Sequence, residues 1–276
     1  MDTPTPDAEN IRAFYNEYGA EREWARFDTM LGQVQLHVIT QFLRDWALPA
    51  SRALDVGSGP GRFAIWLAEQ GCRVTLLDVS DAMIAAARER VRAAQVESAV
   101  EGFYQASLFD IGTLDVGTFD VILCLGGVLN YYPQDMPAAL RDLRQALAPG
   151  GRLIGTVMST VGALASSLSR GWAPPESVAA QELRQVYETG VLTEAFSPHP
   201  AKMLHAGELR QLLSESGLRT LGLSATDCLL SVPDAGLEAL RTRDNLFRTL
   251  LDLEVDACRR MPDAGGHILF AADAVG

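Results

Sequence analysis

Apolar and polar residues change period repeatedly between residues 50 and 160. Short, nearly continuous apolar runs, of the kind that buried strands require, are separated by segments in which apolar residues recur every three to four positions. This alternation predicts parallel strands joined by helices, and hence an α/β chain. The expected strands lie at 53–56, 74–78, 100–105, 119–125 and 152–159. The expected helices between them lie at 63–70, 82–94 and 136–147.

The pattern differs on both sides of this region. Before it, apolar and aromatic residues at helical spacing predict amphipathic helices over 8–24 and 31–46. After it the strand and helix rhythm breaks, with short helical patterns at 161–169 and 177–187. Four more elements are then expected, alternating helix and strand, at 207–216, 218–231, 237–260 and 267–272. The whole pattern predicts a seven-stranded, mostly parallel sheet with helices on both faces.

A glycine-rich loop follows the first strand of the core, in the run Ala-Leu-Asp-Val-Gly-Ser-Gly-Pro-Gly that ends at Gly61. Glycine lacks a Cβ, so Gly57, Gly59 and Gly61 allow positive φ angles and a close approach of the backbone to a ligand. The helix that follows points its free N–H groups at the same place. Asp78 ends the next strand, where a carboxylate accepts hydrogen bonds from ribose hydroxyls. The loop therefore predicts a site for a nucleoside-containing ligand.

The spacing of the glycines separates two kinds of cofactor. The dinucleotide pattern needs a small residue at position 62, where this chain has Arg62. The run from Leu54 to Gly61, with Asp78 further on, resembles the first motif of the class I S-adenosylmethionine (SAM) methyltransferases. The text Leu-Ala-Pro-Gly-Gly-Arg-Leu at 147–153 resembles a second, structural signature of that family.

This resemblance implies a Rossmann-like fold, SAM as cofactor and S-adenosylhomocysteine (SAH) as product. It divides the chain into an N-terminal helical lid (1–46), a SAM-binding core (47–159), a substrate-covering insertion (160–205) and a C-terminal part of the core (206–276). Relatives use a basic residue near the start of the second helix to contact the SAM carboxylate, whereas this chain has Gln33 and Gln35 there and Arg26 earlier. The residues expected to bind the cofactor are Tyr18 with Tyr15 in the lid, then Gly57, Ser58, Gly59, Gly61, Asp78, Val79, Ser107, Leu108 and Gly126.

Methyl transfer from a sulfonium needs alignment of the reacting atoms more than it needs a metal, but a hydroxyl acceptor benefits from a nearby base. His199 and His205 are the candidates because they fall in the expected insertion; the alternative is that His205 caps a helix and that His199 is an ordinary loop residue. Tyr131, after the fourth strand, is the further candidate to face the acceptor. His37 and His267 are expected to be structural.

The amino-acid composition narrows the choice of methyl acceptor. The chain has 276 residues, and 35 acidic against 23 basic residues give a net charge of −12, which repels nucleic acids and anionic membranes and favours a small-molecule substrate. The four cysteines form no C-x-x-C pair, so neither a metal site nor a disulfide is expected. No apolar run is long enough to span a membrane and the first residues lack a signal peptide, so a cytoplasmic monomer or homodimer is expected.

Two alternatives to a small-molecule O- or N-methyltransferase stay open. The late helix and the last strand are also similar to those of the bacterial tRNA carboxymethoxyuridine methyltransferase, which would make the substrate an RNA. The chain could also bind SAM without transferring a methyl group, although the intact glycines and Asp78 count against this reading.

Overall fold

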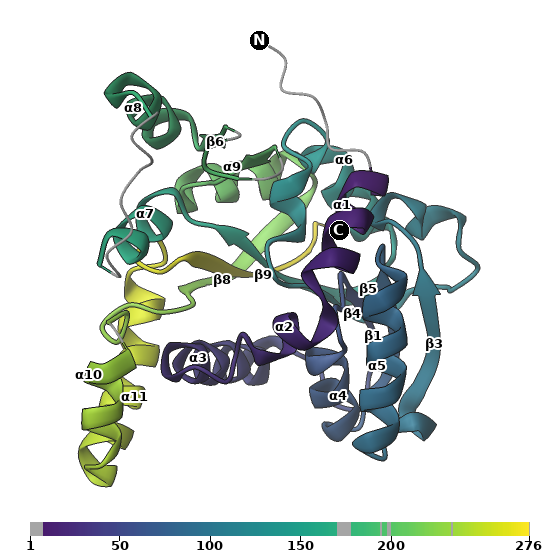
Figure 1. Ribbon diagram of the computed structural model, residues 1–276. Helices are drawn as coiled ribbons and strands as arrows, with labels where there is room; N and C mark the ends of the chain where they lie inside the picture. Colours follow the sequence, from purple (N-terminus) through teal and green to yellow (C-terminus); the bar gives the residue numbers. More distant parts are fainter. Residues whose placement is uncertain (1–7, 170–177, 194, 198–199, 233, 276) are drawn as a thin grey trace.

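The computed structural model describes residues 8–169, 178–193, 195–197, 200–232 and 234–275, and these form an α/β fold (Figure 1). The strands are β1 (Arg52–Val56), β2 (Arg73–Asp78), β3 (Val100–Gln105), β4 (Phe119–Cys124), β5 (Leu147–Met158), β6 (Val191–Leu192), β7 (Ala201–Lys202), β8 (Leu218–Ala225) and β9 (His267–Ala274). The helices are α1 (Ala8–Tyr18), α2 (Ala20–Ala25), α3 (Met30–Trp46), α4 (Arg62–Glu69), α5 (Asp81–Ala93), α6 (Met136–Gln145), α7 (Thr160–Ser169), α8 (Ala180–Thr189), α9 (Ala206–Glu215), α10 (Asp234–Arg241) and α11 (Asp244–Arg260). Short 3-10 helices lie at η1 (Glu97–Ala99), η2 (Leu108–Thr113) and η3 (Val128–Tyr131).

The central sheet has seven strands in the order β3-β2-β1-β4-β5-β9-β8. Strands β1 to β5 pair in parallel, whereas β9 lies antiparallel between β5 and β8. The predicted seven-stranded, mostly parallel sheet is therefore confirmed. Its strand order reverses between β1 and β4, and the carboxyl ends of these two strands bound a crevice of the kind that binds ligands in open α/β sheets.

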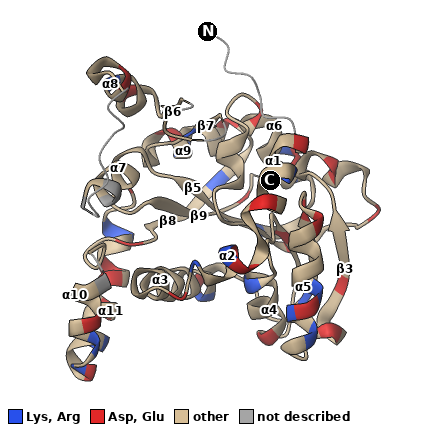
Figure 2. Ribbon diagram, in the orientation of Figure 1, with Lys and Arg blue, Asp and Glu red and all other residues tan. Residues whose placement is uncertain are grey.

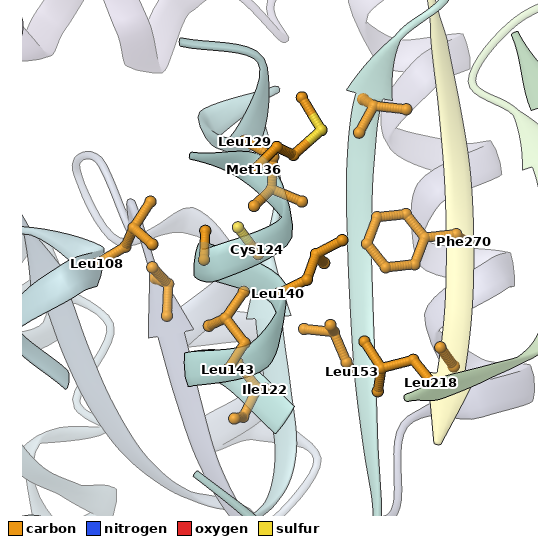
Figure 3. Packing of buried hydrophobic residues seen from close by; sticks show 14 of the residues in the cluster. Leu108, Ile122, Cys124, Leu129, Met136, Leu140, Leu143, Leu153, Leu218 and Phe270 are labelled. Carbon is orange, nitrogen blue, oxygen red and sulfur yellow. The ribbon is translucent and has the colours of Figure 1, made fainter. Parts of the chain in front are cut away.

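Alternate residues of the strands fill two cores, one on each face of the sheet. On one face apolar residues of α9 belong to a single cluster. Ile122 of β4 and Phe270 of β9 lie in the same cluster with apolar residues of α6 (Figure 3). On the other face their neighbours, Val121 and Leu269, pack with residues of α3, α4 and α5. Strands buried on both faces read as continuous apolar runs, which explains why their positions could be predicted.

Three of the predicted helix and strand boundaries differ in the structure. The helix expected over 8–24 is broken at Gly19, whose φ of 87° ends α1 and starts α2. The helix expected over 237–260 is two helices, because the chain turns at 242–243 between α10 and α11. The strand expected to reach residue 231 ends at Ala225, beyond which the carboxylate of Glu254 accepts hydrogen bonds from the N–H groups of Cys228 and Leu230.

The segment 160–205 holds α7, α8 and the two-stranded pair of β6 and β7, and a single bridge from Ser159 to Leu204 closes it. Asn130 of η3 fixes its base: the amide donates to the Lys202 carbonyl at 2.6 Å and accepts from the Met158 N–H at 2.9 Å. Asn130 is fully buried, so its place is structural. Within the described ranges, no helix combines the length and apolar character needed to cross a membrane.

Candidate functional site

The glycine loop after β1 is held against the end of β2. The N–H groups of Gly57 and Ser58 donate to the Leu77 carbonyl at 2.8 and 3.1 Å, and the Gly59 N–H donates to the Asp78 carboxylate at 2.8 Å. Gly57 has a φ of 66°, and a Cβ at this position would overlap the side chain of Val128. Both the backbone conformation and the space therefore require glycine here.

Gly61 serves packing, which differs from the ligand contact expected for it. It has a φ of 88° and precedes α4, and a Cβ there would lie 3.2 Å from the Cβ of Ala87 on α5. The third glycine of the motif thus lets α5 approach the loop, and Gly61 is outside the lining of the cavities described below.

A cavity of about 660 Å³ opens at the carboxyl ends of β1, β2 and β4, between the glycine loop and α1. Eight of the eleven residues predicted to bind a cofactor line this first cavity, as does Tyr131. The eight are Tyr15, Gly57, Gly59, Asp78, Val79, Ser107, Leu108 and Gly126.

The N-terminal helix contributes Tyr15, and not Tyr18, to this cavity. The Tyr15 hydroxyl lies 3.0 Å from the Tyr131 hydroxyl, and burial is the main cause that raises the pKa of both phenols. Tyr18 instead stacks on Phe14 and lies under the guanidinium of Arg22. The two tyrosines are neighbours on α1, with ring centroids 6.2 Å apart, and only Tyr15 lines the cavity.

Polar contacts fasten α1 to the start of α5. The Asn16 amide donates to the Asp81 carboxylate at 2.8 Å and accepts from the Ser80 hydroxyl at 2.6 Å. Arg12 forms an ion pair with the same carboxylate at 3.1 Å. Figure 1 shows α1 and α2 lying across the edge of the fold above α4 and α5. The helix therefore covers the first cavity in a fixed position.

Two buried carboxylates lie below the loop. Asp78 is 7% exposed and accepts hydrogen bonds from the N–H groups of Gly59 and Ser80, yet burial raises its pKa to about 6. Asp55 is more deeply buried, and burial followed by the charge of Asp78 raises its pKa to about 7. One oxygen of Asp55 and the hydroxyl of Ser58 lack a hydrogen-bond partner in the described part of the chain. These groups face a third cavity of about 410 Å³ beside the loop.

Glu23 and Arg26 of the α2 segment add opposite charges to the site. Their side chains form an ion pair at 3.2 Å, and burial raises the pKa of Glu23. Both line the first and third cavities, and Arg26 also lines a second cavity on the side of β5 and β9. From the sequence, Arg26 is named only through the family resemblance, and Glu23 is missed because the position of Glu23 depends on the break at Gly19.

Of the two histidines predicted to act as bases, the structure describes His205. His205 precedes α9, where its backbone N–H donates to the Glu208 carboxylate at 2.9 Å, and it lines none of the three cavities. His205 therefore stands at the helix-capping position that was the alternative prediction for it. His199 lies outside the described residues. His267, expected to be structural, lines the second cavity instead.

Part of the chain matches a known protein family. Residues 53–151 match the family described as Methyltransferase domain. A curated relative, the ubiquinone biosynthesis O-methyltransferase of Xanthomonas campestris, is 31% identical over 140 residues, which are 48% of this chain and 56% of the relative. The chain spans about half the length of the curated relatives it matches.

Two solved structures share the fold over nearly the whole chain. The 1,6-didemethyltoxoflavin-N1-methyltransferase of Burkholderia thailandensis, solved with SAH, has a TM-score of 0.59 at 16% identity, covering 100% of this chain and 94% of its own. The magnesium protoporphyrin IX methyltransferase of Synechocystis, solved with SAM, has a TM-score of 0.57 at 17% identity, covering 99% of both chains. Residues 53–151 of this chain thus match a methyltransferase domain, and its seven-stranded fold is shared with methyltransferases solved with SAH and with SAM.

Proposed function

We propose that the chain transfers the methyl group of SAM to an oxygen or nitrogen of a small-molecule acceptor. The observation that carries this proposal is the first cavity, which the glycine loop, the Asp78 carboxylate and Tyr15 enclose at the switch point of the sheet. The matched methyltransferase domain, residues 53–151, supplies most of this wall.

The residues of the cavity fit the parts of SAM. Asp78 would accept hydrogen bonds from the ribose hydroxyls, and Val79, Ser107 and Leu108 would border the adenine. The amino-acid end of SAM carries one positive and one negative group, which Glu23 and Arg26 match in sign. The unpartnered oxygen of Asp55 lies in the third cavity, where this end would lie.

SAM, when bound, supplies an electrophilic methyl group on a positively charged sulfur with a good leaving group. The chain therefore has to orient the reactants and exclude water. Gly126 has a φ of 79° and no neighbouring atom within 4 Å of where a Cβ would be, so its backbone can border the reacting atoms closely. Tyr15 and Tyr131 both line the cavity, and their hydroxyls lie 3.0 Å apart.

The surface charge favours a small acceptor over an RNA. Figure 2 shows acidic and basic residues interleaved on α5 and on α10 and α11. With the net charge of −12, the average field opposes a polyanion. The cytoplasmic location and the monomeric or dimeric state of the chain stay predictions from sequence.

The test begins with calorimetry on the purified chain, using SAM, SAH and NADH in turn. We expect heat with SAM and SAH and none with NADH; the opposite result would refute the proposal. Labelled SAM is then offered with a small-molecule extract or with bulk tRNA. Label in the extract supports the proposal, label in tRNA moves the chain to the RNA-modifying alternative, and binding without label in either leaves a SAM-binding protein without transfer activity.

A further inference from the structure

The second cavity lies next to the first and differs from it in character. It encloses about 480 Å³ and shares Arg26, Leu125 and Gly126 with the first cavity. Its apolar wall includes Phe27 and Phe63, whose rings meet edge to face at 5.9 Å. An apolar wall with aromatic rings suits a flat, uncharged ring system.

Five polar side chains line this cavity, and four of them have partners within the chain. The Arg26 guanidinium pairs with the Glu23 carboxylate at 3.2 Å. The Gln35 amide and the Thr226 hydroxyl donate to the Asp227 carboxylate at 2.9 and 3.0 Å. The Thr156 hydroxyl accepts from the Gly127 N–H at 3.2 Å. The fifth is the imidazole of His267, which has no hydrogen-bond partner among the residues that the structure describes. The ring nitrogens of His267 are thus available to a ligand in the cavity.

The antiparallel course of β9 brings His267 to the reacting end of the site. Its register pairs His267 with Met158, the last residue of β5, so the first residue of β9 lies at the carboxyl edge of the parallel strands. A Cβ on Gly127 would lie 3.5 Å from the Nε2 of His267. The imidazole therefore lies against the turn after β4, whose first glycine, Gly126, lines both cavities.

Resting on the function proposed above, we propose that the second cavity receives the methyl acceptor and that His267 takes the proton from an aromatic hydroxyl of that acceptor. The glycine turn then separates the two reactants, with the donor in the first cavity. His267 is a catalytic residue in this assignment because its ring would contact the reacting hydroxyl.

The step balances in charge and atoms. The hydroxyl oxygen forms a bond to the methyl carbon, the carbon–sulfur bond breaks, and its electron pair returns to sulfur as a neutral thioether. The hydroxyl proton passes to the imidazole of His267. The positive charge that leaves the sulfur reappears on the imidazolium, so the site keeps its total charge.

The charges around His267 favour a phenol over an aliphatic alcohol. Burial, followed by the charge of Arg26 on α2, lowers its pKa to about 4, while Asp227 after β8 acts in the opposite sense. The imidazole is therefore neutral at neutral pH and ready to accept a proton, but it is a weak base. A weak base needs an acidic hydroxyl, and a phenol, with a pKa of about 10, is far more acidic than water at about 15.7.

The test compares His267→Asn with His37→Asn, the same change at a histidine on α3 that lines none of the three cavities. Each protein is incubated with methyl-labelled SAM and a panel of phenols and catechols, and SAH binding is measured by calorimetry. We expect the wild type to label at least one phenol. We expect His267→Asn to lower kcat about tenfold or more, less than the roughly 100-fold of a base whose pKa lies near the working pH, and to leave SAH affinity unchanged. His37→Asn should match the wild type.

Each contrary result has a distinct meaning. Turnover of a phenol by His267→Asn within threefold of the wild type refutes the role of His267. SAH binding without labelling of any phenol refutes the aromatic hydroxyl acceptor. A tenfold loss of SAH affinity in His267→Asn would mean that the donor itself occupies the second cavity, which also overturns the assignment. Absence of SAH binding in the wild type would instead remove the function on which the inference rests.

Discussion

Replacing Asp78 by Asn tests the assignment of the first cavity to a ribose-containing ligand. Both carboxylate oxygens already accept a backbone N–H, from Gly59 and Ser80, which fixes the carboxylate at the cavity wall. Hydrogen bonds to a charged group contribute about 1.5–3 kcal/mol each, so losing the charged acceptor for two ribose hydroxyls costs about 3 kcal/mol. This corresponds to somewhat more than a hundredfold weaker binding of SAH.

The pH dependence sharpens this prediction. Because burial raises the pKa of Asp78 to about 6, the ligand-free chain carries a protonated Asp78 below that pH. SAH affinity of the wild type should therefore fall about tenfold for each pH unit below 6, and Asp78→Asn should be weak at every pH. Calorimetry between pH 5 and pH 8 measures both, with Asp115→Asn, an exposed acid outside the three cavities, as the control.

Stability should respond in the opposite direction. The rise in the pKa of Asp78 from 3.8 to about 6 corresponds to about 3 kcal/mol of stability, present below pH 4 and lost as the pH rises through 6. Urea unfolding of the ligand-free Asp78→Asn chain should lack this loss. SAH affinity of Asp78→Asn within threefold of the wild type would refute the ribose assignment. A fall at low pH in both proteins would assign the titration to another group, such as Glu23.

Three other changes test single features of the fold and the site. Gly61→Ala should lower the free energy of unfolding in urea by about 1–3 kcal/mol, because Gly61 has a positive φ and the Cβ of Ala87 lies close. Gly71→Ala is the control, since Gly71 has a similar φ but open space around it, and should lose only the part due to the backbone. Equal losses in the two variants would refute the packing role of Gly61. Asn16→Ala should raise the dissociation rate of SAH severalfold in stopped-flow measurements with little change in the association rate, because it loosens α1; an unchanged dissociation rate would show that α1 does not hold the ligand. His205→Ala should keep kcat within twofold at every pH, because its contact with Glu208 uses the backbone N–H; a loss of more than tenfold would restore His205 to the mechanism.

The sequence determined the parts of the site that are contiguous in the chain. The glycine loop and Asp78 follow consecutive strands, and parallel strands place their carboxyl ends at one edge, so Gly57, Gly59, Asp78 and Gly126 meet without further information. Continuous apolar runs likewise fixed the strands, because each is buried on both faces.

Tertiary structure alone decided which side chains face the cavities. The rotation of α1 brings Tyr15 and not Tyr18 to the site, and the approach of α5 turns Gly61 into a packing position. His267 reaches the turn after β4 only because β9 inserts antiparallel beside β5, which reverses the end of the strand that lies at the ligand edge. Periodicity specifies whether a segment is a strand, but strand order and direction follow from how the two cores close, and these contacts join residues far apart in sequence.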